Sequence, residues 1–197
     1  VRLEVRGGLA FRFPRNIRPQ AEQLIRQFET AFDLVREWHK GISIRGPIVM
    51  ELLPTDGGGF QGENVVGLQV FGPKIDVLGV GGHELGHLFT TPGFPDVFCE
   101  SYASKVGARV CKAILGRSPF GDTPEIEAYR RSFQEYEATT GRKITFAELP
   151  NSDSPAWSPT TAKLMWMLCV LEQRYGDGFV ANLFAYREAI PGFPGRE

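Results

Sequence analysis

Residues 75–88 read Ile75-Asp76-Val77-Leu78-Gly79-Val80-Gly81-Gly82-His83-Glu84-Leu85-Gly86-His87-Leu88. We predict that this apolar stretch forms a helix, which ends before the helix-breaking segment Thr91-Pro92-Gly93-Phe94-Pro95. Glycine weakens a helix interior by up to about 1 kcal/mol relative to alanine, so the glycines at 79, 81 and 82 indicate close packing against another backbone. On a helix, His83 and His87 are four residues apart and therefore lie on one face.

The pentapeptide His83-Glu84-Leu85-Gly86-His87 contains two of the three histidines in the chain, with a carboxylate between them. Imidazole nitrogens bind zinc at about 2.0–2.1 Å, and two of them on one helical face can share one ion. Glu84 lies on a neighbouring face, from which it can reach a water activated by the metal. We therefore predict that His83 and His87 bind one Zn²⁺. Glu84 is then the catalytic general base, which passes the proton of the water to the leaving amine.

A helix can also carry two histidines as ordinary surface or core residues. The helix predicted at 75–88 is otherwise apolar and rich in glycine, which indicates that it is buried. A buried set of two histidines and a glutamate is costly without a metal unless its polar atoms are all hydrogen-bonded. We therefore favour the zinc interpretation.

A catalytic zinc site needs a third protein ligand and an open position. No histidine follows His87, and His39, at the end of a predicted helix, is better explained as a surface or capping residue. We therefore expect a carboxylate as the third ligand. The nearest downstream carboxylates are Asp96, Glu100, Asp122, Glu125 and Glu127. We favour Glu100, because it lies about one turn into a predicted helix whose cap is Asp96.

The rest of the chain predicts strands and one helix first, and helices afterwards. Apolar and charged residues alternate at 1–5, which is typical of a half-buried strand, and Gly7-Gly8 predicts a hairpin turn. Further strands are predicted at 9–13, 42–44, 48–53 and 65–71, and residues 56–62 are interpreted as a surface loop. Further helices are predicted at 19–40, 96–115, from 125 onward, at 160–175 and at 178–189.

These elements predict an α+β fold, with a small mixed N-terminal β-sheet, the motif helix and a mainly helical C-terminal half. The chain has 197 residues, 42% of them hydrophobic, and can therefore bury a substantial core. We predict a single domain, with a sheet lobe at about residues 1–90 and a helical lobe at about residues 91–197.

Composition disfavours several classes of partner. The 22 basic and 23 acidic residues give a net charge of −1, whereas nucleic-acid binding needs a basic surplus or stripe. The three cysteines are widely spaced and predict neither a disulfide framework nor a metal-binding knuckle. No apolar run reaches the length of a membrane span. We expect a soluble protein, either cytoplasmic or exported with its leader removed.

His83-Glu84-x-x-His87 followed by Glu100 on a second helix resembles the gluzincin branch of the zinc metallopeptidases. Two single-glutamate groups of that branch are similar, the enhancin-like peptidases and the plant basic secretory protein family. In both groups the third ligand lies near the start of the next helix. The run Glu100-Ser101-Tyr102-Ala103-Ser104 is similar to the Glu-Gly-x-Ala-Asp run of the second family. The resemblance covers about residues 45–188, and its specific motif is the pentapeptide.

This resemblance implies a zincin-like fold, in which the edge strand of a mixed sheet binds an extended peptide above the helix that carries the ligands. Peptides bind such edges by adding a strand to the sheet. Our candidate for the edge is the strand at 65–71, with Val65, Gly67 and Gln69 as substrate-binding residues.

Two other groups of residues bear on this site. Tyr102 and Tyr175 are candidates for stabilising the oxyanion of the transition state, although such tyrosines more often belong to the core. Thermolysin-like gluzincins carry Asp four residues after the ligand Glu, to orient a zinc-bound histidine, whereas this chain has Ser104 there. We therefore expect Asp76, Asp96 or a backbone carbonyl to orient the histidines instead.

The predicted function is hydrolysis of peptide bonds in a peptide or protein substrate, most simply as an endopeptidase with one zinc ion. A second hypothesis is a catalytically inactive zinc-binding domain that recognises peptide or glycan. The presence of Glu84 argues against it, because an inactive relative can readily lose that residue. A nucleic-acid-associated protease is disfavoured by the charge balance and by the missing third histidine.

Overall fold

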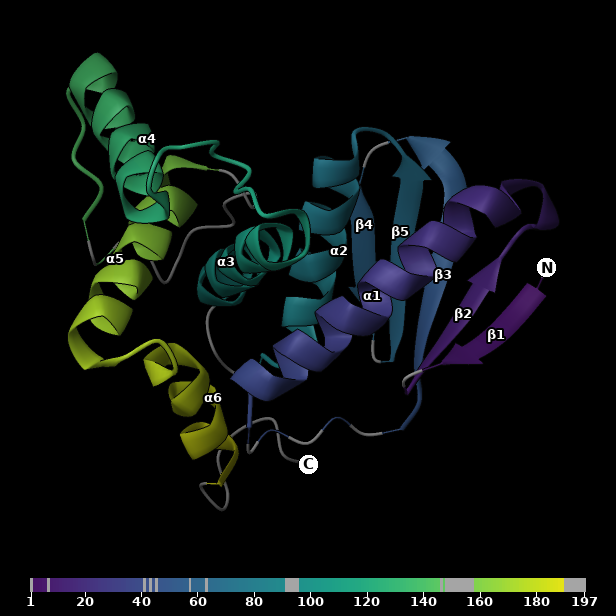
Figure 1. Cartoon of the computed structure of the whole chain (residues 1–197). Helices are drawn as coiled ribbons and strands as arrows, with labels where there is room; N and C mark the ends of the chain where they lie inside the picture. The colour runs from purple at the N-terminus through teal and green to yellow at the C-terminus, as the bar shows by residue number, and fades with distance from the viewer. Residues whose placement is uncertain are drawn as a thin grey trace.

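The computed structural model describes residues 2–6, 8–40, 42, 44, 46–56, 58–62, 64–90, 96–145, 147 and 158–189. Within them the strands are β1 (Arg2–Arg6), β2 (Leu9–Phe13), β3 (Ile48–Asp56), β4 (Gly59–Gly62) and β5 (Val65–Phe71). The helices are a 3₁₀ turn η1 (Arg15–Ile17), α1 (Arg18–Trp38), α2 (Lys74–His87), α3 (Asp96–Leu115), α4 (Glu125–Thr140), α5 (Pro159–Tyr175) and α6 (Phe179–Ala189). The chain is therefore a mixed α+β protein, with an N-terminal sheet and a mostly helical C-terminal half (Figure 1).

The five strands form one mixed sheet in the order β1-β2-β3-β5-β4. The two outer pairs, β1 with β2 and β4 with β5, are antiparallel, while β2 with β3 and β3 with β5 are parallel. Phe11, Met50 and Val66 follow one another across the sheet in register, and all three are fully buried. They belong to one core with apolar residues of α1, α2 and α3, so these helices cover that face of the sheet.

The first strand differs from the half-buried strand that its alternation predicts. Leu3 and Val5 are 62% and 72% exposed, because the register pairs Leu3 with Arg12 and Val5 with Ala10. Neighbouring residues of a strand point to opposite faces, so Leu3 and Val5 lie on the face opposite to Phe11. Of the predicted Gly7-Gly8 turn, only Gly8 is among the described residues, and its φ of 86° suits a tight turn.

The prediction that the strand at 65–71 forms the sheet edge is wrong. That strand, β5, lies between β3 and β4, and the edge is β4, in the segment interpreted above as a surface loop. A four-residue Gly-Phe-Gln-Gly strand has too little alternation to be recognised from its residues. The pairing of β4 depends on a tertiary contact, in which the ring of Phe60 packs directly on Gly67 of β5. A Cβ added to Gly67 would lie only 2.0 Å from that ring. The strand predicted at 42–44 is wrong as well, because Ile42 and Ile44 belong to no strand.

The glycines of α2 allow unusually close packing against α3, as their number predicts. A Cβ added to Gly82 would lie 3.0 Å from the Cα of Gly107, and one added to Gly86 would lie 3.0 Å from the Cα of Ala103. Gly81 faces α1 instead, where an added Cβ would lie 2.2 Å from the ring of Phe28. Helix α2 is thus held between α1 and α3, and the C-terminal turn of α2 lies next to the N-terminal part of α3.

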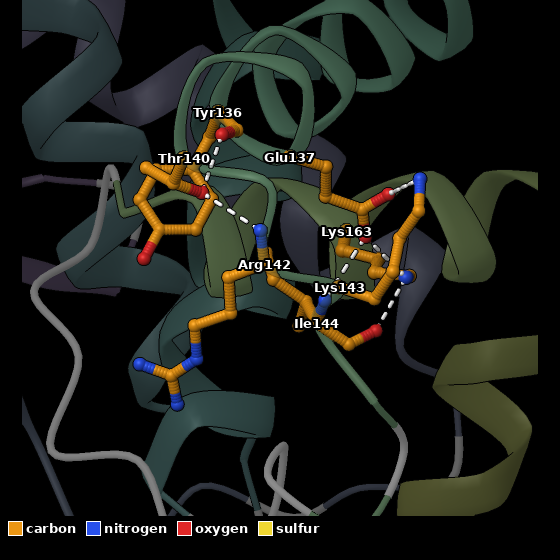
Figure 2. A network of polar contacts seen from close by, with 7 residues as sticks. All are labelled: Tyr136, Glu137, Thr140, Arg142, Lys143, Ile144 and Lys163. Atoms are coloured by element: carbon orange, nitrogen blue, oxygen red, sulfur yellow. Dashed lines mark hydrogen bonds and ion pairs between the residues drawn. The ribbon is translucent and has the colours of Figure 1, made fainter.

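In the helical half, a network of polar contacts fastens the segment after α4 to α5 (Figure 2). The carboxylate of Glu137 accepts hydrogen bonds from Nζ of Lys143 and Lys163, each at 2.9 Å, and from the backbone N–H of Ile144 at 3.0 Å. These partners lower the pKa of Glu137 to about 2. Lys163 also donates to the carbonyl oxygen of Ile144. Both lysines and the backbone N–H of Ile144 donate to partners within this network, which indicates a structural role.

No helix among the described residues combines the length and the apolar character needed to cross a membrane. The longest helix, α1, has one apolar stripe that packs into the core, and charged residues on its other side. Its amphipathic character is that of a helix at the surface of a globular fold.

Candidate metal centre

Three side chains from two helices converge on one point. The Nε2 atoms of His83 and His87, in the last turns of α2, are 3.0 Å apart. Glu100, in the second turn of α3, places one carboxylate oxygen 3.3 Å from Nε2 of His83 and the other 3.3 Å from Nε2 of His87. All three side chains are partly buried.

These distances fit a small metal ion. Four ligands placed tetrahedrally at about 2.0–2.1 Å from an ion are about 3.3–3.4 Å from one another. Two ring nitrogens and one carboxylate separated by 3.0 Å and 3.3 Å therefore have a spacing suited to such an ion. Two histidines and one glutamate are also a donor set of catalytic zinc sites, which keep one position open for water or substrate.

The carboxylate of Glu84 is the other acidic group at this point. Ligand atoms of His83, Glu84 and His87 all lie within 4.8 Å of one another, so this trio can also be considered as a metal-binding group. The shorter distances from both histidines to Glu100 favour Glu100 as the third ligand. Glu84 then stands beside the centre, within reach of a water or substrate there.

His83 is oriented by the residue four positions after Glu100. Its Nδ1 lies 3.1 Å from the hydroxyl oxygen of Ser104, which is buried. When Nδ1 carries the proton and donates it to this oxygen, Nε2 presents its lone pair to the centre. The expectation that Asp76, Asp96 or a backbone carbonyl fills this role is therefore wrong for His83. Residues four apart share a helical face, which is why Glu100 and Ser104 both face α2.

Burial and neighbouring charge affect the two carboxylates differently. Glu84 is only 7% exposed, and this burial raises its pKa, while the two histidines act in the opposite direction and Glu100 adds to the rise. When Nε2 of each histidine carries a proton instead, His83 and His87 both donate hydrogen bonds to Glu100, and these hold the pKa of Glu100 far below its usual range. Two carboxylates whose environments separate their pKa values are suited to different roles. Glu100 is the permanent anion, and Glu84 is the better proton acceptor.

A cavity of about 200 Å³ opens onto the centre, and its lining includes Gly59, His83, Glu84, Ser104 and Pro119. Gly59 begins β4, and a Cβ added to it would lie 2.9 Å from Cγ of Glu84. Only glycine therefore allows the edge strand to lie this close to the carboxylate. Sequence reasoning missed both Gly59 and Ser104 as site residues, and the glycine run at 57–59 is the only signal for the former.

Tyr102 is not available to stabilise an oxyanion. It is 2% exposed, and its hydroxyl is hydrogen-bonded to Nε2 of His39. Nδ1 of His39 donates to the carbonyl oxygen of Val35, and its ring stacks on that of Phe89. His39 is thus a structural residue of the core, which agrees with its exclusion as a ligand but not with a surface position, since it is only 1% exposed.

The remaining predicted residues have other surroundings. Tyr175 is an exposed residue at the end of α5, where its ring stacks on Phe179, and no described contact brings it to the centre. Glu125 accepts a hydrogen bond from the hydroxyl of Tyr129, and Glu127 pairs with two arginines of its own helix. These contacts occupy two of the alternative third ligands, and the other two, Asp96 and Asp122, are exposed.

The three residues predicted to bind substrate from β5 have different neighbours. Val65 pairs with Gly62 of the edge strand, and Gly67 lies under the ring of Phe60. Gln69 follows the β4 pairing and donates its backbone N–H to the carbonyl oxygen of Gly58. Because β4 covers this part of β5, the backbone edge open to a further strand belongs to β4.

No family model matches this chain, and no curated protein matches it either. Two imidazoles and an anionic carboxylate can hold a divalent ion, and a second, buried carboxylate of raised pKa stands beside it. This combination can bind a metal and accept a proton at adjacent positions.

Proposed function

We propose that this protein is a zinc metallopeptidase of the gluzincin type with a zincin-like fold. His83, His87 and Glu100 would hold one zinc ion, and Glu84 would be the general base. The observation that carries the proposal is the convergence of two histidine Nε2 atoms, 3.0 Å apart, with the Glu100 carboxylate, a different oxygen of which lies 3.3 Å from each of them, beside a buried glutamate at the wall of a cavity.

The reaction divides between the metal and the side chains of the chain. A zinc ion held by these residues would supply Lewis acidity, which would lower the pKa of a bound water molecule and polarise the scissile carbonyl. Glu84 accepts a proton from the attacking water and then donates it to the nitrogen of the leaving amine as the C–N bond breaks. Burial raises the pKa of Glu84, which favours its uptake of a proton.

The surrounding residues hold this geometry. Ser104 fixes the ring of His83 through Nδ1, and the close α2–α3 contact keeps Glu100 next to both histidines. The edge strand β4 begins at Gly59, immediately beside Glu84. We propose that an extended peptide pairs with the free edge of β4, which replaces β5 as the substrate-binding strand.

The test compares three variants with the parent protein. Zinc is measured by elemental analysis after removal of loosely bound metal, and hydrolysis is followed on casein and on a broad peptide library, with and without a chelator. Glu84→Gln is expected to keep zinc and to lose about 100-fold or more of turnover, the scale of general-base catalysis. Glu100→Ala is expected to lose zinc. Glu135→Gln, an exposed position on α4, is the matched control and should change neither.

The results separate the hypotheses. Stoichiometric zinc with no cleavage of any library peptide would instead support the inactive domain that binds peptide or glycan. A parent protein that binds no zinc, or a Glu100→Ala variant that binds it as tightly as the parent, would contradict the ligand set.

A further inference from the structure

A second cavity adjoins the one at the metal centre. It has a volume of about 410 Å³, and Phe71, Asp76, Val77 and Val80 contribute to its lining. Val80 also lines the first cavity, as does Gly58, so the two cavities are adjacent, and together they are called the groove below. Both cavities are lined by residues of α2, the helix that runs beside β4 in Figure 1.

Asp76 is the charged residue at the far end of this groove. Positions 76, 80 and 84 are four residues apart and lie on one face of α2, so Asp76 and Glu84 border the same groove. Among the described residues that line the two cavities there are two carboxylates, these two, and no lysine or arginine. Asp76 is exposed and forms no ion pair within the described part of the chain, so its charge is available to a ligand.

The backbone N–H groups of Asp76 and Val77, at the start of α2, are not free to bind an anion. The backbone N–H groups of Asp76 and Val77 both donate to the carbonyl oxygen of Pro73. The carboxylate is therefore the polar group that Asp76 contributes to the cavity. Phe71 and Val77 supply apolar surface around it, which suits a side chain with an apolar stem and a positively charged end.

We propose that this groove selects peptides with a lysine or arginine three or four residues from the scissile bond, and that Asp76 binds that side chain. The proposal rests on the proposed peptidase function. The spacing follows from geometry, because eight residues of helix rise about 12 Å between Asp76 and Glu84. An extended peptide covers that length with three to four residues at about 3.3 Å each.

The experiment places one lysine at successive positions of an otherwise neutral fluorogenic peptide, with glutamine as the reference, and measures kcat/KM for the zinc-loaded protein. Lysine at the third or fourth position is expected to raise kcat/KM about fivefold at low salt, the scale of an exposed ion pair. Added salt should reduce the effect. Asp76→Asn should abolish it, whereas Asp177→Asn, an exposed acid between α5 and α6, should leave it unchanged.

A binding measurement provides the second readout. The same peptides are titrated into the Glu84→Gln protein and into the Glu84→Gln/Asp76→Asn protein, and Kd is obtained from fluorescence anisotropy. The preference for lysine should appear only in the first. Cleavage that is indifferent to the lysine and to Asp76→Asn would overturn the subsite while leaving the peptidase proposal intact. If no peptide were cleaved, the peptidase proposal would fail, and the anisotropy difference would still decide whether Asp76 binds a basic side chain.

Discussion

A Cβ placed on Gly107 of α3 would lie 2.4 Å from the carbonyl oxygen of Gly79 on α2. The two helices therefore touch through their backbones at this point. One turn further along α2, the same added atom would approach the backbone nitrogen of His83 to 3.1 Å. This contact sets the distance between the helix that carries the histidines and the helix that carries Glu100, so the centre depends on a glycine outside the pentapeptide.

Gly107→Ala is expected to force α2 and α3 apart. Overpacking of this kind lowers the free energy of unfolding by about 1–3 kcal/mol. Replacing glycine by alanine within a helix offsets up to about 1 kcal/mol of this loss. Gly79→Ala is the matched control, because its added Cβ would meet only Sγ of Cys111, at an ordinary 3.5 Å. Urea denaturation should show a lower free energy of unfolding for Gly107→Ala only, together with weaker zinc binding. Equal stability of the two variants would refute the close contact.

Ser104→Ala is expected to weaken zinc binding by about 10-fold or more, because it leaves the ring of His83 without its hydrogen-bond partner. Ser104→Asp should bind zinc at least as tightly as the parent, since a carboxylate is the stronger acceptor for Nδ1–H. Affinities are measured by competition with a chromophoric chelator, which does not depend on turnover. If Ser104→Ala retained the affinity of the parent, Ser104 would have only a packing role.

His39 makes the stability of the fold depend on pH. Burial lowers the pKa of His39 from 6.5 to about 4, so between these values the unfolded chain binds a proton that the folded protein does not. The free energy of unfolding should therefore decrease as the pH falls from 6.5 towards 4, by about 3 kcal/mol over the whole range. Above pH 6.5 this effect is absent. Urea denaturation at several pH values measures it.

The double variant His39→Phe/Tyr102→Phe isolates this contribution. It removes both members of the buried hydrogen bond, so that neither is left without a partner. Its free energy of unfolding should vary less between pH 6.5 and 4 than that of the parent. The same slope in both proteins would mean that other groups cause the acid sensitivity.

The ion pair between Lys105 and Glu172 is buried, with 2.6 Å between Nζ and the carboxylate oxygen, and both residues are about 5–6% exposed. Glu172→Gln leaves the buried ammonium group of Lys105 without this partner and should cost about 3–5 kcal/mol. Lys105→Met should cost less, because Glu172 keeps an ion pair with Arg109 at 3.9 Å. Lys105→Met/Glu172→Leu should cost less than the sum. A double-mutant cycle from urea denaturation tests this, and additive single effects would show that the pair is not coupled.

Much of the fold could be predicted from periodicity. The helices predicted at 19–40 and 160–175 agree with α1 and α5 to within about two residues of the observed bounds, and the helix predicted from 125 onward begins where α4 begins. The short strand β4 could not be predicted, because its residues have no pattern of their own and it is formed by pairing with β5. The exposed positions of Leu3 and Val5 were missed for a related reason, since the alternation of a strand does not say which face a helix will cover.

What the sequence by itself determined is local. The four-residue interval between His83 and His87 places both rings on one side of a helix whatever surrounds it, because helical geometry depends only on neighbours along the chain. The partners of those rings were decided by tertiary structure. Glu100 and Ser104 reach the histidines because glycines at the α2–α3 crossing let the two backbones come into contact. Tyr102 lies in the core, where its hydroxyl is hydrogen-bonded to His39, 63 residues earlier in the chain. Contacts between residues so far apart depend on how whole elements pack, and no local pattern records that packing.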